Sequence, residues 1–443
     1  MSLLSKFKNE PLFAKVIRSS GSLFSSNAIA LGLSVLQGIM ATRLLGPAGF
    51  GLIGVVMAFA STVNSIFSFR MSELVVRYGG EYLNRGEKDK ASAVIKIAGF
   101  TEGIVSLLAF FVVVAAASLA ETHLAKTPGV SWMFTVYALG LLANFNTETS
   151  TGILQITDRI KLQGTINLAQ SIFTSIVIVG AFFLNGTLPI VLGAYLLGKS
   201  ILGLGMFVAA QIQLNKRLGS GWWRTPFSAL TARKDIFRFA FSSNISATLI
   251  KIFRESDLIW VGFFLDTTAV GYYRVAYTLV HFLAIPADPL IAATFPEINR
   301  LAVEKAWNKL KSFLRKVTAF SFAYNIILGG GLIIFGPWLI RIYSGAEYLG
   351  AYPALVALVI GLVFNYILFW NRPLLLSLGL PEFPVYATLI AGLLKLGFSF
   401  AFVPRYGIVA AGALLSFYYI ASVGMMVIRG VGEIQKQRRK MQE

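Results

Sequence analysis

The sequence predicts an all-α polytopic membrane protein with twelve transmembrane helices, built as two parallel six-helix bundles that face a central cavity. The composition is the first reason. Of the 443 residues, 56% are hydrophobic and 13% are charged, with a mean hydropathy of +0.71, whereas soluble domains have about 25% charged residues. Such a chain has too few polar side chains to cover its surface in water, so we expect it to lie in a bilayer.

Twelve apolar runs are the second reason for this fold class. Each is long enough to cross roughly 30 Å of hydrocarbon as a helix. They fall near 21–42, 51–69, 94–119, 131–153, 165–184, 189–210, 239–264, 270–295, 315–340, 353–376, 384–403 and 408–428. An even number of spans places both termini on the same side of the membrane.

The distribution of basic residues predicts which side that is. Of the 39 Lys and Arg residues, 29 fall in segments on the side of the termini, 4 in the opposite loops and 6 within spans. Because cytoplasmic loops are enriched in Lys and Arg, we expect both termini in the cytoplasm. The net charge of +19 is then explained by topology and by anionic lipid headgroups, so we expect the lipid bilayer and no nucleic acid as a partner.

The match between the two halves is the third reason. Adding 220 to the first six spans gives positions close to the last six, and GPAGFG at 46–51 aligns with DTTAVG at 266–271. Six spans per half make the repeat parallel, which is typical of alternating-access transporters. We expect a cytoplasmic amphipathic segment (1–20), an N-lobe (21–210), a cytoplasmic linker (211–238), a C-lobe (239–430) and a basic cytoplasmic tail (431–443).

The residues available for chemistry exclude several classes of protein. There is no cysteine and there are only two histidines, so we expect neither a metal centre nor a cofactor. No G-x-x-x-x-G-K-[ST] motif is present, which argues against direct use of ATP. No predicted exofacial loop is long enough for a catalytic domain, so we expect a protein that is not an enzyme and has no catalytic residue.

Four charged residues in the predicted seventh span need an explanation, because each costs roughly 2.5–3.5 kcal/mol at the centre of a lipid-facing helix. Lys251, Arg254, Glu255 and Asp257 lie on one side of that helix. In one interpretation the pairs Lys251–Glu255 and Arg254–Asp257 neutralise each other. In the other, the two basic residues bind an anion and the two acids couple transport to an ion.

Other polar residues within spans are candidates for the same cavity. AIPADPL at 284–290 is expected to break its helix around Asp288, and Arg274 has an alternative role as an interfacial anchor. The candidates for anion binding are Arg254, Lys251, Lys199, Lys395 and Arg274. The candidates for polar contacts to substrate are Asn144, Asn146, Asn365, Asn371 and Arg372. The candidates for ion coupling are Asp257, Glu255, Asp288 and Glu148.

Several motifs, taken in order, resemble one known family. They are LLGPAGFG (44–51), LQITDRIKLQG (154–164), GAEYLGAYPAL (345–355), LSLGLPEFP (376–384) and VPRYGIVAAGAL (403–414). They resemble the polysaccharide transporter family, the Wzx-type flippases of the multidrug/oligosaccharidyl-lipid/polysaccharide exporter superfamily, over nearly the whole chain.

This resemblance implies a bacterial inner-membrane protein that moves undecaprenyl-diphosphate-linked oligosaccharides, the units of O-antigen, capsule or exopolysaccharide, from the cytoplasmic to the periplasmic leaflet. It also implies a V-shaped pair of bundles with a cationic lumen, and partners such as a polysaccharide polymerase and chain-length proteins. Lys251 and Arg254 match only the general pattern of basic residues in the seventh span.

Three alternatives are weighed against this interpretation. A multidrug or organic-cation exporter should have an acidic and aromatic cavity, and Lys199 and Lys395 argue against that. A peptidoglycan-precursor flippase typically has two further C-terminal helices. A membrane glycosyltransferase or polymerase, which belongs to a different class, typically has a large exofacial loop.

Overall fold

The computed structural model describes residues 11–68, 70–230, 252–253, 256–285 and 287–440, with side chains from residue 28 onward except at 287–289, 292–293 and 440. All regular structure in this part of the chain is helical. Seven of its helical stretches are long and apolar enough to cross a membrane. The predicted class, an all-helical polytopic membrane protein, is confirmed.

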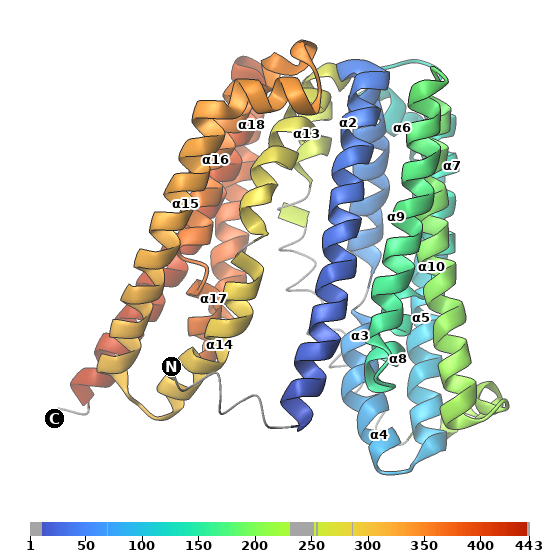
Figure 1. The fold of residues 1–443 in the computed structure, drawn as a ribbon, viewed down its shortest axis with the longest axis vertical. Coiled ribbons are helices and arrows are strands. Elements are labelled where there is room, and N and C mark those ends of the chain that lie inside the picture. Colours follow the sequence, from blue (N-terminus) through green and yellow to red (C-terminus); the bar gives the residue numbers. More distant parts are fainter. Residues whose placement is uncertain (1–10, 69, 231–251, 254–255, 286, 441–443) are drawn as a thin grey trace. The chain divides into compact units, whose positions relative to one another are not determined.

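Two very long helices each contain two predicted spans. Helix α2 (Pro11–Phe67) is interrupted at Gly46 (φ 64°, ψ 177°), and α18 (Phe383–Lys440) at Gly407 (φ 64°, ψ −148°). Both glycines adopt a positive φ, and the backbone of a residue with a side chain would be strained in this conformation. Each lies between two of the predicted apolar runs, so a single glycine marks the boundary between consecutive spans. Figure 1 shows both helices.

The helices of the first half follow α2 in chain order. They are α3 (Met71–Leu74), η1 (Val75–Gly79), α4 (Gly80–Asn84), α5 (Lys88–Ala115), α6 (Ala117–Ala120), η2 (Glu121–Ala125), α7 (Ser131–Ala143), α8 (Thr147–Ile156), α9 (Ile160–Phe183), α10 (Leu188–Leu218), η3 (Trp222–Arg224) and η4 (Phe227–Ala229). Helix α10 packs along α9 and also contacts α7 and α8. A buried apolar cluster that includes Val75, Ile95 and Ile153 joins η1, α5 and α8.

The second half repeats this pattern. Its helices are α12 (Asp257–Phe264), α13 (Thr267–His281), η5 (Phe282–Ala284), α14 (Ala287–Val303), α15 (Trp307–Tyr343), η6 (Ala346–Ala351), α16 (Tyr352–Ile367), α17 (Asn371–Ser377) and α18. Helix α16 packs against α15 and α18. AIPADPL does mark a helix break, because η5 and Ile285 follow α13, but Asp288, around which the break was expected, already lies in α14.

Helix breaks recur at matching places in the two halves. The fourth predicted span is split into α7 and α8, which start at 131 and 147, and the tenth into α16 and α17, which start at 352 and 371. These starts differ by 221 and 224 residues, close to the offset of 220 expected from the sequence. Each break leaves backbone groups that need partners other than the helix itself.

Contacts divide the chain into two compact units. Most of the first half forms one unit, while residues 46–58 and 122–127 pack with the described residues of the second half. The lobe boundaries expected at 21–210 and 239–430 stay a prediction.

Candidate functional site

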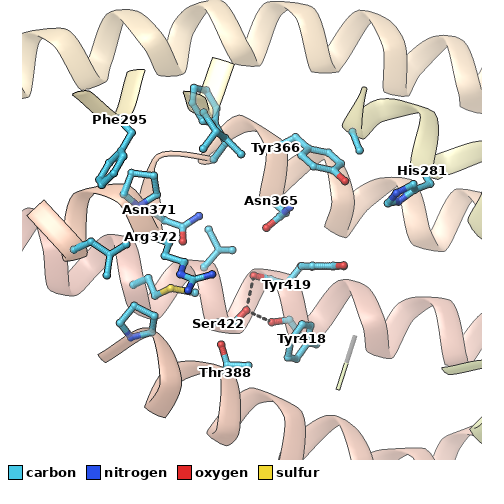
Figure 2. A pocket seen from close by; sticks show the side chains of 18 residues that line it. His281, Phe295, Asn365, Tyr366, Asn371, Arg372, Thr388, Tyr418, Tyr419 and Ser422 are labelled. Carbon is cyan, nitrogen blue, oxygen red and sulfur yellow. Dashed lines mark hydrogen bonds between the residues drawn. The ribbon is translucent and has the colours of Figure 1, made fainter. Parts of the chain in front are cut away.

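A cavity of about 490 Å³ lies within the second unit. It is surrounded by the end of α13 and by α14, α16, α17 and α18. Three residues predicted from the sequence to contact substrate, Asn365, Asn371 and Arg372, line it together (Figure 2). The tenth span therefore brings these three candidates to one site.

The break between α16 and α17 sets the position of two of these side chains. Asn371 is buried, and its Nδ2 donates a hydrogen bond of 2.7 Å to the carbonyl oxygen of Leu368, which satisfies part of the interrupted backbone. The next residue, Arg372, is exposed and lines the cavity. No Asp or Glu occurs among the described lining residues, so this part of the wall contributes a permanent positive charge and no carboxylate.

Helix α18 supplies a polar and aromatic wall. Tyr418, Tyr419 and Ser422 are almost fully buried and line the cavity, with Thr388 beside them (Figure 2). Ser422 Oγ donates to the Tyr418 carbonyl oxygen at 2.7 Å. The sequence interpretation missed this wall, although the spacing of 418, 419 and 422 puts all three on one helix face.

His281, at the end of α13, also lines the cavity. Its ring stacks on Tyr277, with centroids 5.7 Å apart. Together the lining offers a guanidinium, amides, hydroxyl groups and aromatic faces. Such a set can bind an anionic group through Arg372 and sugar hydroxyls through the rest.

A buried ion pair lies behind the tyrosine wall. Lys395 Nζ contacts Asp257 Oδ1, and both side chains are less than 10% exposed. Lys395 Nζ also donates to the Phe253 carbonyl oxygen at 2.9 Å, and Tyr273 donates its hydroxyl hydrogen to Asp257 Oδ2 at 2.9 Å. The Lys395 ammonium is 5.7 Å from the ring centre of Tyr418, which lines the cavity.

This pairing changes how two candidates are interpreted. From the sequence, Asp257 was a candidate either for a pair with Arg254, three residues away, or for ion coupling, and Lys395 was a candidate for anion binding. Instead Asp257 and Lys395 are partners 138 positions apart. Sequence spacing cannot reveal such a pair, because it depends on how α12 packs against α18.

The predicted polar residues of the first unit gather at the break between α7 and α8. Asn144 Nδ2 donates to the carbonyl oxygens of Gly140 (2.8 Å) and Lys199 (2.9 Å), while the Lys199 ammonium is 5.2 Å from the Tyr137 ring centre. Asn146 Nδ2 donates to the Gly99 carbonyl oxygen at 3.2 Å. These amides therefore bind the backbone at the break.

Glu102 of α5 holds the start of α8. Its Oε1 accepts from the backbone N–H of Glu148 at 2.8 Å and its Oε2 from that of Thr149 at 2.9 Å. A carboxylate at a helix N-terminus also interacts favourably with the positive end of the helix dipole. Glu148 itself accepts from Ser72 Oγ at 2.6 Å. The sequence interpretation missed this cap, although an acidic residue within a predicted span, Glu102, is a signal that could have pointed to it.

Arg274 of α13 contacts the segment 46–58 of α2. Its guanidinium donates to the Phe50 carbonyl oxygen at 3.1 Å and lies 4.1 Å from the Phe50 ring centre. Two glycines allow the close approach. A Cβ at Gly51 would clash with the Thr267 carbonyl oxygen, and one at Gly271 with that of Pro47. The contacts 47–271 and 51–267 are equivalent under the 220-residue repeat, so GPAGFG and DTTAVG pack reciprocally.

The remaining candidates cannot be placed. Lys251, Arg254 and Glu255 lie outside the described residues. Asp288 falls in α14, in a stretch whose side chains are not described.

Comparison with known proteins agrees with this architecture. A multidrug resistance MATE family transporter of the MOP superfamily, solved in an inward-facing conformation, matches with a TM-score of 0.74 and 15% identity, covering 92% of this chain and 95% of that one. The lipid II flippase MurJ, in an inward closed conformation, matches with a TM-score of 0.72 and 15% identity, covering 95% and 90%. The fold is therefore the twelve-helix, two-lobe fold of these transporters.

The relatives found by sequence have low identity to this chain but match most of its length. The inner membrane protein YghQ of Escherichia coli is 24% identical, over 77% of this chain and 95% of its own length. The probable low-salt glycan biosynthesis flippase Agl15 of Haloferax volcanii is 22% identical, over 89% and 79%. The family described as polysaccharide biosynthesis protein matches residues 16–302. With well over half of its length matched, this chain is a member of the polysaccharide biosynthesis protein family.

Proposed function

We propose that the protein is a flippase for lipid-linked oligosaccharides that works by alternating access. The cargo would be an undecaprenyl-diphosphate-linked oligosaccharide, moved from the cytoplasmic to the periplasmic leaflet of a bacterial inner membrane. Membership of the polysaccharide biosynthesis protein family supports a cargo of this class. The names of Agl15 and MurJ, both flippases, point the same way.

The cavity beside Arg372 is the observation that supports this function best. A diphosphate needs a cationic partner, and an Arg guanidinium can donate two parallel hydrogen bonds to it. Sugar hydroxyls need amides, hydroxyl groups and aromatic faces, which Asn365, Asn371 and Tyr419 provide. The polyprenyl chain can remain in the bilayer. A cavity for organic cations would instead need acidic side chains. The described lining of the cavity beside Arg372 contains none.

The expected topology gives this cavity a place in the transport cycle. Arg372 lies at the end of the tenth span that we assign to the cytoplasmic side, together with both termini. The cavity would therefore receive the diphosphate-linked glycan from the leaflet in which it is assembled. A reporter fused after Glu443 should be active in the cytoplasm and inactive in the periplasm.

Substitution of Arg372 tests the assignment. In vesicles that contain the purified protein and a lipid-linked glycan, Arg372→Ala should abolish glycan exposure at the outer face. Arg372→Lys should restore only part of it, because an ammonium keeps the charge and loses the bidentate fork. The matched control is Arg405→Ala, which removes an exposed arginine of α18 that does not line the cavity. Wild-type transport by Arg372→Ala would refute the site.

The assay separates the flippase from its alternative. If the wild-type protein exports an organic cation and leaves the glycan in the inner leaflet, a multidrug exporter is the correct interpretation. If it moves both, Arg372→Ala should affect only the anionic cargo.

A further inference from the structure

A second cavity, of about 250 Å³, lies within the first unit, apart from the site described above. Its walls are α5, the junction of α7 and α8, and α10, and the short helices η3 and η4 cover it. Most of its lining is apolar or aromatic, including Phe100, Phe145 and Phe227. The transport function proposed above does not use this cavity.

One lysine connects the cover of this cavity to its wall. Lys96 of α5 donates from Nζ to the Thr225 carbonyl oxygen at 2.7 Å and lies 4.5 Å from the ring centre of Phe227. Thr225 uses one of the three N–H donors of the ammonium group. No Asp or Glu occurs among the described residues that line the cavity. The site therefore combines a positive charge with an apolar interior, which favours an anionic amphiphile.

The surroundings match the headgroup region of a bilayer. Trp223 is 56% exposed, with the Arg224 guanidinium 5.0 Å from its ring centre, and Phe227 is 45% exposed. Tryptophan beside basic residues is typical of the membrane–water interface. Exposed apolar residues continue from the cavity along both walls, with Phe100 and Ile104 on α5 and Ile212 on α10. An acyl chain leaving the cavity would find an apolar path between these helices.

We propose that this cavity binds one anionic phospholipid of the surrounding leaflet. The phosphate contacts Lys96, and the first part of one acyl chain occupies the cavity between α5 and α10. The cavity is too small for a whole lipid, since it falls below the roughly 300–1,000 Å³ of ordinary ligand pockets, so the rest of the lipid stays in the bilayer. A bound lipid would stabilise the docking of residues 219–230, where the linker between the halves begins.

Fluorescence quenching by brominated lipids tests this proposal. The full-length protein is reconstituted in phosphatidylcholine vesicles with a minor fraction of phosphatidylglycerol, and the bromine atoms are placed on one lipid or the other. The signal of Trp222, which lines the cavity, is obtained as the difference from Trp222→Phe. Quenching should favour phosphatidylglycerol about fivefold, as expected for one basic residue near an anionic headgroup.

Three substitutions connect that preference to Lys96. Lys96→Gln should reduce the preference to about one, while Lys96→Arg, which keeps the charge, should retain most of it. Lys90→Gln is the matched control, because Lys90 lies on the same helix and pairs with Glu87 outside the cavity. Equal quenching by both lipids in the wild-type protein would overturn the proposal. So would an unchanged preference in Lys96→Gln, or no quenching of Trp222 by either lipid.

Discussion

The buried pair of Asp257 and Lys395 gives the most quantitative prediction. Two unit charges 4 Å apart attract by about 4 kcal/mol at an effective dielectric constant of 20. Removing one partner leaves the other charged and buried, which typically costs 3–5 kcal/mol. We therefore expect Lys395→Met and Asp257→Asn each to destabilise the protein by about 3–5 kcal/mol. Tyr273 should make Lys395→Met the milder change, because its hydroxyl still donates to the carboxylate.

The double variant separates the pair from its surroundings. Asp257→Asn/Lys395→Met removes both charges together, so the double variant should lose less stability than the two single losses combined, by a coupling energy of about 2–3 kcal/mol. Stability is measured by denaturant titration of the detergent-solubilised protein, followed by size-exclusion chromatography. Lys90→Met, which breaks a more exposed pair with Glu87, should change little and serves as the control.

Two results would refute this reasoning. If each single variant loses no more stability than Lys90→Met, the pair is not desolvated in the folded protein. If the double variant loses as much as the two single variants together, the two charges do not stabilise each other.

Three further predictions concern helix ends and crossings. Glu102→Ala leaves the backbone N–H groups of Glu148 and Thr149 unpaired, and each should cost roughly 1–3 kcal/mol of stability. Glu102→Gln should cost less. Denaturant titration measures the stability of both variants. Gly271→Val should lower the free energy of unfolding by about 1–3 kcal/mol through overpacking against α2. Gly180→Ala, with no atom within 4 Å of the new methyl group, should leave it unchanged. Equal losses of stability in the two variants would contradict the close contact at Gly271. Backbone N–H donors after η2 lower the pKa of Glu121 below its ordinary value of 4.5. Its stabilisation should be present above that value and lost as the pH falls through the lowered pKa, so Glu121→Gln should flatten the melting temperature measured between about pH 6 and pH 3.

The helical membrane fold could be predicted from the sequence, because the hydropathy of a span and the charge of a loop are properties of contiguous segments. The segment 284–290 also marked a real helix break, since prolines disfavour an uninterrupted helix. The glycines of GPAGFG and DTTAVG were matched as repeat equivalents. Their reciprocal contact was not predicted, because the repeat relates two segments without saying that they touch.

The partners of individual charges were harder to predict. Lys395, Lys199 and Arg274 were grouped as anion-binding residues. In the structure Lys395 pairs with Asp257, and Lys199 lies beside the Tyr137 ring. Arg274 donates to the Phe50 carbonyl oxygen. A charged residue in a span must find some partner, and composition cannot choose between a substrate, a carboxylate and a carbonyl group. Arg372 was placed with the polar candidates, and it lines the larger cavity.

Alternating access requires that a contact between the two halves of the chain open during each cycle. Residues 46–58 come from the first half but pack with α13 of the second, so we expect this contact to separate. The chain lacks cysteine, so introduced pairs can be oxidised selectively. At residue 54 a Cβ would lie 3.4 Å from Val270 Cγ1, and at residue 329 it would lie 3.9 Å from Val363 Cβ. Both spacings are compatible with a disulfide or a short cross-linker.

The most direct test is therefore glycan transport by Gly54→Cys/Val270→Cys, measured before and after oxidation. We expect cross-linking to stop transport and a reductant to restore it. Gly329→Cys/Val363→Cys links neighbouring helices α15 and α16 of the second half and should transport equally well in both states. Undiminished transport by the oxidised 54–270 pair would contradict alternating access through this contact.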